Sequence, residues 1–347
     1  MTSSPRVSAR AGLRAALLFV LGLGNLSCAE APDLVIYVAH DQIHSEDLLR
    51  RFEAETGLRV RARYDSETNK TVGLVNALRE ERNRTRCDVF WNNEFAHTAA
   101  LAKEGLLASY DSPSAAAIPA TFRDPARRWT GFAARARVLI VNTELVPDPS
   151  GIRGMRDLLD SRWAGRVGMA RPLTGTTLTH AAALFSVLGA EEAVAYYREI
   201  RERNADGALS LVSGNAYLKD LVAKGELAWG WTDTDDYNVA REAGAPVAVV
   251  YPDQDGIGTL LIPNTVSILA GAPHPAAARR FVDWILREDV EAELARSRAA
   301  QIPVRAAVPR PAHVIGGEAL RFMAVDYAEV GEHLVERQEV LKELFLD

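Results

Sequence analysis

The chain has 347 residues, a formal net charge of −6 and two cysteines. This length exceeds what one hydrophobic core comfortably supports and predicts two lobes. The acidic balance excludes nucleic acid as an expected partner, because phosphate backbones select basic surfaces. Two cysteines cannot form a disulfide framework, and Cys87, within an expected strand, is interpreted as a small buried residue.

The first 28 residues are interpreted as an export signal, because three arginines precede a short apolar run at residues 15–23. That run is too short to span a bilayer as a stable helix. Cys28 stands where a lipoprotein signal places its lipidated cysteine, and ordinary cleavage after Ala29 is the alternative. We expect the lipidated form. Removing residues 1–27 deletes three arginines and no acidic residue, so the net charge falls from −6 to −9.

Strands and helices alternate along the first part of the mature chain. The expected strands are residues 34–38, 58–64 and 88–91, and each is followed by a helix. This order predicts a parallel sheet with right-handed crossovers.

Two extended segments are expected to cross between two α/β units. Residues 136–142 leave the first unit, residues 143–250 form the second, and residues 258–264 return. Helices near 275–287 and 289–297 and a helical tail from about residue 316 complete the chain. The predicted fold is α/β and two-lobed, with the crossover strands forming a hinge that closes on a ligand. The predicted first lobe comprises residues 29–137 and 259–305, and the second comprises 138–258 and 306–347.

An acidic segment at residues 229–237 ends an expected strand and starts a helix. It carries Asp233, Asp235 and Asp236 within four residues. Carboxylates this close raise one another's pKa unless donors or a cation compensate them. A junction of this kind at the carboxyl edge of an α/β sheet is where small ligands bind. Helix capping is the alternative, and it explains one carboxylate rather than three. Trp229 and Trp231 share a strand face and are expected in the core.

A second candidate site precedes the helix after residue 175. Thr174 and Thr176 supply hydroxyls, Gly175 permits close backbone approach, and free N–H groups at a helix start bind anions. Simple N-capping by threonine is the alternative. Arg135 and Arg137 share one face of the crossover strand. They are candidates to bind an anion or to form structural ion pairs with the acidic residues.

Polar residues also follow two strands of the first unit. Glu94 follows residues 88–91 and is either a ligand or an acid favoured by the start of a helix. His40, Asp41 and His44 follow the first strand, and either histidine could face the cleft or be solvated. The local motifs of serine hydrolases, zinc proteases and dinucleotide-binding enzymes are not present in the sequence, and we predict a protein that is not an enzyme.

Taken in order, six segments resemble the periplasmic solute-binding proteins of ABC importers, in the ferric-ion-binding group. They are Leu34-Val-Ile-Tyr-Val38, Asp88-Val-Phe-Trp-Asn-Asn-Glu94, Ala134–Thr143, Pro172-Leu-Thr-Gly-Thr176, the acidic segment 229–237 and Ala276–Trp284. The resemblance implies a monomer in the periplasm that delivers its solute to an inner-membrane permease. It also implies no required cofactor, ferric iron as cargo, and contact with the membrane only through the lipid anchor.

In the group that this sequence resembles, the ferric site consists of a loop histidine, a glutamate after the third strand and two adjacent tyrosines. Glu94 matches the glutamate, and His40 and His44 are the candidates for the histidine. The tyrosine pair aligns with Thr234-Asp235, while Tyr237 lies nearby without occupying either position. The phenolates that select trivalent iron are therefore missing from this sequence.

Positions that hold a companion anion in the family match Thr174, Gly175, Thr176 and Arg137. Two interpretations of the solute follow. In the first, Glu94, Asp233 and Asp235 replace the phenolates and bind ferric iron through oxygen. In the second, the pocket holds an organic solute, either a polyamine or a phosphonate-like oxyanion. We favour iron with its companion anion. An enzyme or a ligand sensor on the same fold is the alternative of another class.

Overall fold

The computed structural model describes residues 31–40, 42–65, 71–314 and 320–346. The predicted signal peptide and Cys28 lie outside these residues, so their assignment stays a prediction. The described residues from 32 to 346 form one compact unit. Within the described part of the chain, none of the helices is both long and apolar enough to cross a membrane.

The first part of the chain forms the predicted parallel sheet. Strands β1 (Leu34–Val38), β2 (Val60–Tyr64) and β3 (Val89–Asn92) pair in the order β2-β1-β3. They alternate with helices α1 (Gln42–Thr56), α2 (Val72–Glu80) and α3 (Ala96–Lys103). Every residue of β1 is buried, as expected for an inner strand covered on both faces. The sequence-based prediction of these elements is confirmed.

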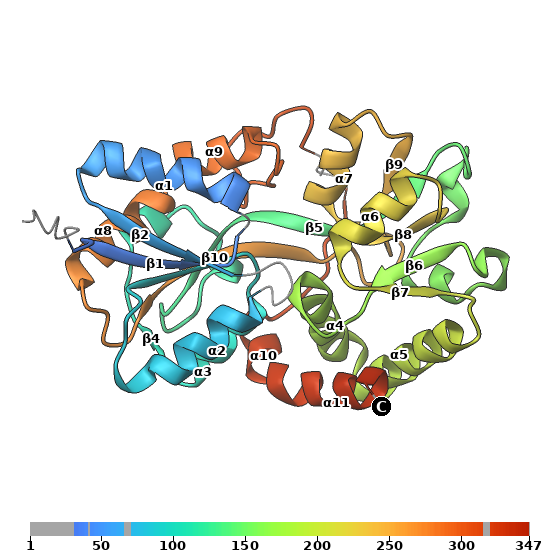
Figure 1. Cartoon of the computed structure of the whole chain (residues 1–347), viewed down its shortest axis with the longest axis horizontal. Helices are drawn as coiled ribbons and strands as arrows, with labels where there is room; N and C mark the ends of the chain where they lie inside the picture. Colours follow the sequence, from blue (N-terminus) through green and yellow to red (C-terminus); the bar gives the residue numbers. More distant parts are fainter. Residues whose placement is uncertain (1–30, 41, 66–70, 315–319, 347) are drawn as a thin grey trace, which may run out of the picture. The chain divides into compact units, whose positions relative to one another are not determined.

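Two antiparallel strands join the first part of the sheet to the second (Figure 1). Strand β5 (Thr130–Asn142) pairs with β10 (Leu261–Leu269) through its first half and with β8 through its second. All thirteen residues of β5 are buried. The strand begins at Thr130 and is therefore longer than the predicted 136–142. The residues of its first half are buried like those of its second half. These two strands are the crossovers of the two-lobed fold.

The second α/β unit repeats the alternation. Strands β6 (Val167–Ala170), β7 (Ser210–Val212) and β8 (Trp229–Asp233) are parallel, and β9 (Val247–Val250) pairs with β5. Its helices are α4 (Gly175–Leu188), α5 (Ala190–Ala205), α6 (Asn215–Ala223) and α7 (Thr234–Glu242). Helices α4, α6 and α7 follow β6, β7 and β8 respectively, so their amino ends gather at one edge of the sheet.

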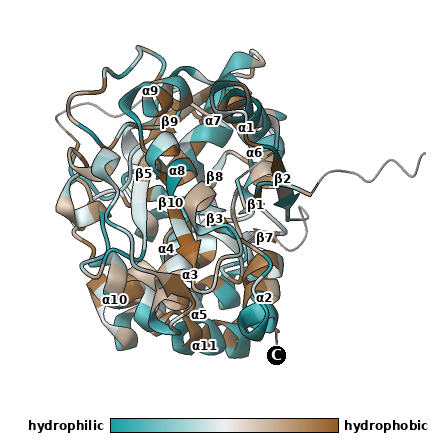
Figure 2. Cartoon of the chain, turned by 90° about the vertical axis from the view of Figure 1, so that its left-hand side faces the viewer, coloured by the Kyte–Doolittle hydropathy of each residue, from teal (hydrophilic) through white to brown (hydrophobic). Residues whose placement is uncertain are grey.

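The last part of the chain is mainly helical. After β10 come the helices α8 (Pro275–Ile285), α9 (Glu288–Arg296), α10 (Tyr327–Glu332) and α11 (Leu334–Leu346). The short strand β4 (Leu107–Ala108), which lies earlier in the chain, also pairs with β10. Helix α10 packs against α3 and α4, and α11 packs against α3, α4 and α5. The tail thus contacts both units, and the predicted lobe boundaries stay a prediction. Figure 2 shows hydrophilic residues, in teal, on α1 and α2.

Candidate functional site

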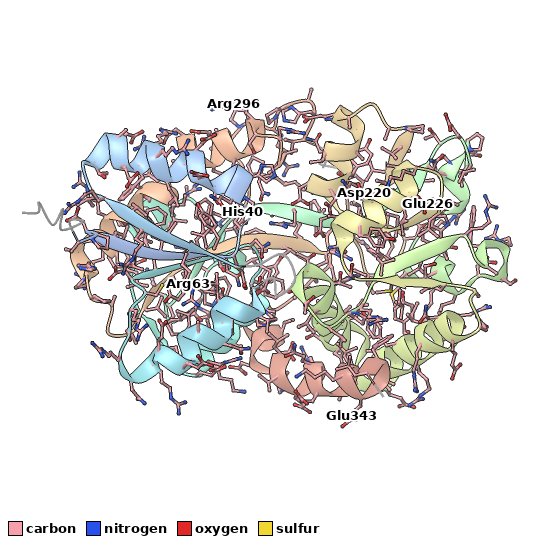
Figure 3. The ribbon with its side chains drawn as sticks, viewed as in Figure 1. His40, Arg63, Asp220, Glu226, Arg296 and Glu343 are labelled. Carbon is pink, nitrogen blue, oxygen red and sulfur yellow. The ribbon has the colours of Figure 1, made fainter. Side chains whose placement is uncertain are left out.

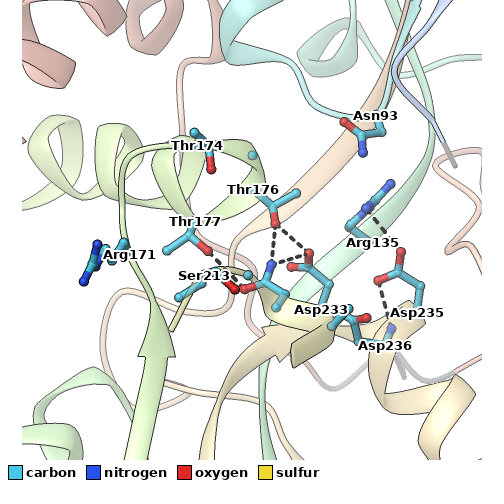
Figure 4. Close-up of a pocket in the computed structure, with 15 residues that line it drawn as sticks. Asn93, Arg135, Arg171, Thr174, Thr176, Thr177, Ser213, Asp233, Asp235 and Asp236 are labelled. Carbon is cyan, nitrogen blue, oxygen red and sulfur yellow. Dashed lines mark hydrogen bonds and ion pairs between the residues drawn. The ribbon is translucent and has the colours of Figure 1, made fainter. Parts of the chain in front are cut away.

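A polar cavity of about 120 Å³ lies where α4, α6 and α7 begin (Figure 4). Most of its walls come from these three helix starts, with Arg135 from β5 and Asn93 from the loop after β3. Its lining residues are Asn93, Arg135, Ala170, Arg171, Thr174, Gly175, Thr176, Thr177, Ser213, Gly214, Asn215, Ala216, Asp233, Asp235 and Asp236. The carboxyl edge of the parallel strands therefore carries the site, as predicted from the acidic segment.

The start of α4 is shaped by Gly175. Its φ of 57° is in the left-handed region, which glycine adopts without a steric penalty. Thr174 is the N-cap residue, yet among the described contacts its side chain makes no capping hydrogen bond. Thr176 instead donates to Asp233 across the cavity. Both threonines line the cavity, and the alternative of simple N-capping by the Thr174 side chain is not observed among the described contacts.

Asp233 is the centre of the hydrogen-bond network. Its Oδ1 accepts from Arg137 Nη1 at 2.8 Å, and its Oδ2 accepts from Thr176 Oγ1 at 2.6 Å and from Asn215 Nδ2 at 3.1 Å. Asn215 also donates to Thr176 Oγ1 at 2.8 Å. Arg137 is fully buried, 5.7 Å from the centre of the Trp231 ring. Asp233 is thereby fixed by residues from β5, α4 and α6.

The other two carboxylates have different partners. Asp235 Oδ2 lies 3.2 Å from Arg135 Nη1, and Asp235 Oδ1 accepts from the backbone N–H of Asp236 at 3.1 Å. Asp236 Oδ2 accepts from Thr232 Oγ1 at 2.8 Å. One carboxylate oxygen from each of the three aspartates can be chosen so that all lie within 4.8 Å of one another. This spacing allows the three side chains to share one cation.

The arginines change the expected electrostatics of this segment. Burial raises the pKa of Asp233, but Arg137, Arg135 and the hydrogen bond from Thr176 outweigh it, and the pKa lies below the ordinary value. The prediction that crowding would raise the pKa of the carboxylates is therefore wrong for Asp233. Its compensating guanidinium groups come from β5, nearly a hundred residues earlier in the sequence. Both arginines form the structural ion pairs that were the alternative to anion binding.

Glu94 does not lie with the described residues that line the cavity. It is fully buried, and Oε2 accepts from the backbone N–H of Ala96 at 2.6 Å and from Thr179 Oγ1 at 2.8 Å. Its Oε1 accepts from Asn92 Nδ2 at 2.7 Å and lies 3.0 Å from His97 Nδ1. These contacts match an acid at the start of a helix, which was the alternative interpretation, and a ligand role for Glu94 stays a prediction.

The remaining predicted residues lie in other surroundings. His40, after β1, is buried with its ring 5.5 Å from that of Trp91 and 5.9 Å from that of His44 (Figure 3). Tyr237 is buried within a hydrophobic cluster of the second unit, and burial raises its pKa. Neither histidine and no tyrosine stands among the described residues that line the cavity. Asp41 lies outside the described residues.

Sequence reasoning missed Ser213, Gly214 and Asn215, which form the start of α6. Asn215 donates to Asp233 and accepts from Thr177 Oγ1 at 3.1 Å. The signal for this segment was present, because Ser213-Gly-Asn215 follows a strand and precedes a helix just as Thr174-Gly-Thr176 does. The strand before it, β7, has only three residues and was not predicted. The predicted core positions of Cys87, Trp229 and Trp231 are confirmed.

Comparison with known proteins identifies the family. The family model described as bacterial extracellular solute-binding protein matches residues 47–320, and the chain belongs to this family. The iron uptake protein A1 of Synechocystis is 24% identical over 301 residues, which cover 82% of each chain. Major ferric iron-binding protein of Neisseria meningitidis is 20% identical over 297 residues, again 82% of each chain.

Solved structures share the fold. The ferric binding protein of Campylobacter jejuni superimposes with a TM-score of 0.81 at 21% identity, covering 90% of this chain and 99% of that one. The periplasmic binding protein AfuA of Actinobacillus pleuropneumoniae, solved with fructose-6-phosphate, gives a TM-score of 0.76 at 22% identity, with 89% and 96% covered. At these identities the similarity shows the two-lobed fold.

Proposed function

We propose that this solute-binding protein captures ferric iron at the three-aspartate site and delivers it to an inner-membrane ABC permease. The observation that carries the proposal is the cluster of Asp233, Asp235 and Asp236, whose oxygens lie within 4.8 Å of one another at the cavity. Carboxylates are hard oxygen ligands of the kind that a trivalent cation prefers. The Synechocystis and Neisseria relatives are named as an iron uptake protein and a ferric iron-binding protein, which supports this cargo.

Binding iron here would differ from binding through phenolates. No tyrosine stands among the described residues that line the cavity. A ferric ion held by carboxylates and water has no phenolate from which charge can transfer. The iron-loaded protein should therefore lack an intense visible absorption band.

Iron retention tests the proposal directly. Metal-free protein is loaded with ferric nitrilotriacetate, passed through a desalting column and analysed for bound iron. We expect about one iron per chain in the wild type and a large loss in Asp235→Asn and Asp236→Asn. Asp47→Asn is the matched control, because Asp47 is an exposed aspartate on α1. If the wild type retains no iron, or if the wild type and all three variants retain equal amounts, there is no metal site at this cluster.

A second candidate is an organic solute that carries an oxyanion. It is favoured by Arg135 and Arg137, which already neutralise Asp235 and Asp233, and by the amino ends of three helices around the cavity. AfuA, which shares this fold, has been solved with a bound sugar phosphate.

Thermal melting separates the two candidates. The melting temperature of metal-free protein is measured with ferric citrate, citrate alone, a hexose phosphate and an alkylphosphonate. A ligand that binds only the native state raises the melting temperature, with about 2.7 kcal/mol gained at 100 times its dissociation constant. A melting temperature that rises with ferric citrate, but with none of the other three ligands, supports iron as the cargo. An increase with the phosphorylated solutes and none with iron assigns the cavity to the second candidate.

Export and closure complete the proposal. Cys28 would carry lipid and tether the protein to the membrane, with the permease as its partner. Cys28→Ala should then move the protein from the membrane fraction to the soluble fraction, and a soluble wild type beginning at Glu30 would contradict this. Ligand bound between the lobes should close them about β5 and β10. Small-angle scattering should show a smaller radius of gyration with verified ligand, and an unchanged radius would exclude the hinge mechanism.

A further inference from the structure

The carboxylate of Asp233 lies at a point on which three donors from three separate elements converge. Arg137 comes from β5, Thr176 from the first turn of α4 and Asn215 from the first position of α6. Their donor-to-oxygen distances are 2.8, 2.6 and 3.1 Å respectively. A guanidinium, a hydroxyl and a side-chain amide at the starts of two helices are the groups that proteins use to hold an oxyanion. We call Arg137, Thr176 and Asn215 the oxyanion corner.

An empty oxyanion corner would be costly. Arg137 has no exposed surface, and a buried charge that has lost its partner strongly destabilises the folded protein. Asp233 supplies the missing negative charge from within the chain. It is itself 3% exposed, with both of its oxygens engaged by the corner. The chain therefore provides its own anion at this position.

Arg137 retains donors that Asp233 does not use. Its Nη1 makes the contacts with Asp233 and Thr176, while Nε and Nη2 are buried without a hydrogen-bond partner among the described residues. A free oxyanion prefers a guanidinium through two parallel N–H donors. Removing the Asp233 carboxylate would leave Arg137, Thr176 and Asn215 without the acceptor that they share, in a space that an oxyanion from solution could fill.

We propose that Asp233 is a built-in anion: it fills the oxyanion corner, so that this protein holds its ligand without a separately bound companion oxyanion. The proposal deepens the proposed function and rests on it only for the identity of the ligand. It also replaces the expectation that Thr176 and Arg137 bind a companion anion, since Asp233 already takes their hydrogen bonds. Asp233 then contributes its negative charge to the three-aspartate site, while Asp235 and Asp236 supply the oxygens that contact the ligand.

Anion binding to the metal-free protein tests the role of Asp233 independently of iron. Wild type, Asp233→Ala and the control Asp47→Ala are titrated with inorganic phosphate by calorimetry. Asp47 is an exposed aspartate on α1 and is not among the described residues that line the cavity. We expect Asp233→Ala to bind phosphate at least tenfold more tightly than the wild type and the control. Equal affinities in the three proteins, or a folded Asp233→Ala that binds no phosphate, would overturn the proposal.

A second variant keeps the test decisive if Asp233→Ala does not fold. Asp233→Asn retains the side-chain volume and removes the charge, so phosphate should raise its melting temperature more than that of the wild type. An equal rise in both proteins refutes the built-in anion.

Iron loading with and without added anions tests the role of Asp233 separately from the identity of the cargo. Wild type should retain as much iron from ferric nitrilotriacetate in buffer freed of phosphate and carbonate as in buffer containing them. Iron retention that requires either anion overturns the proposal. Failure of iron to bind in every buffer contradicts the proposed cargo, while the phosphate titration still decides the role of Asp233.

Discussion

Replacing Glu94 with glutamine distinguishes a structural carboxylate from a ligand. The structure places Glu94 at the start of α3, fully buried and saturated with donors from β3, α3 and α4. Each carboxylate oxygen has two partners within 3.0 Å, Ala96 N–H and Thr179 for Oε2, and Asn92 and the His97 ring for Oε1. The backbone N–H of His97 also donates to both oxygens, at 3.2 and 3.3 Å. In Glu94→Gln, one oxygen becomes an NH₂ group that faces donors and can accept from neither of its two former partners.

The magnitude follows from those two lost bonds. At the lower end of the range, about 1.5 kcal/mol for each hydrogen bond to a charged group, losing two costs roughly 3 kcal/mol of unfolding free energy. For a chain of this size, about 2 °C of melting temperature is lost per kcal/mol, which gives a decrease of roughly 6 °C. Urea denaturation and calorimetry at pH 7 measure both quantities. Glu46→Gln is the control, because Glu46 forms an exposed pair with Arg50 on α1, and such pairs contribute little.

The pH dependence gives the prediction a second readout. Burial raises the pKa of Glu94, but His97, Thr179 and Asn92 outweigh it and hold the pKa below the ordinary value. A lowered carboxyl pKa contributes stability that is present above the unfolded-state pKa and is lost as the pH falls through the folded-state value. The gap between wild type and Glu94→Gln should therefore narrow below about pH 4.3. A variant that is as stable as the wild type but retains no iron would restore Glu94 as a ligand and refute the structural role.

Three further predictions concern the core of the second unit and the buried thiol. Gly230→Ala should lower the unfolding free energy by about 3 kcal/mol in urea denaturation, because its Cβ would lie 2.4 Å from the carbonyl oxygen of Gly168. Near-normal stability would mean that β6 and β8 can move apart. Burial, assisted by a nearby guanidinium, lowers the pKa of His180 to about 3, so its ring should stay neutral in NMR titrations above pH 5. A depressed histidine pKa makes folding less favourable as the pH falls from 6.5 towards 3, and a His180→Phe variant that is folded should lose that part of the dependence. Cys87 is fully buried, with its pKa raised by burial, and in a Cys28→Ser chain it should react with thiol reagents only as fast as the protein unfolds. Rapid labelling of the native chain would contradict its burial.

The sequence predicted the elements whose signals are local. Alternation of strands and helices, the two crossovers and the helix starts at Gly175 and Thr234 all depend on residues within one element, and these were confirmed. The length of β5 was underestimated because a strand enclosed on both faces shows no period-two pattern, and its first half contains Gly131 and several alanines. Strand β7 was missed because three residues carry too little pattern to recognise.

The candidate site divides in the same way. The positions of Thr174, Thr176 and Asp233 at one cavity followed from their placement after parallel strands, because such strands end at the same edge. The same argument failed to bring Glu94 to the cavity. A glutamate after a strand can turn towards the first N–H groups of the next helix, and Glu94 accepts hydrogen bonds from Ala96 and His97 there.

The charge of the site could not be read from the acidic segment, because charge is a property of everything that faces a cavity. Three aspartates in four residues predict strong repulsion when they are considered by themselves. In the fold, β5 runs antiparallel to β8 with Arg137 directly opposite Asp233, and its alternate residue Arg135 reaches Asp235. The pairing of two strands from distant parts of the chain thus converts an excess of negative charge into two ion pairs. Asp233 keeps both of its oxygens engaged by Arg137, Thr176 and Asn215. If a carboxylate held by three donors is a poor ligand for a cation, then Asp233→Asn should weaken iron retention less than Asp236→Asn does. The reverse order in the desalting assay would show that the cation takes Asp233 away from Arg137.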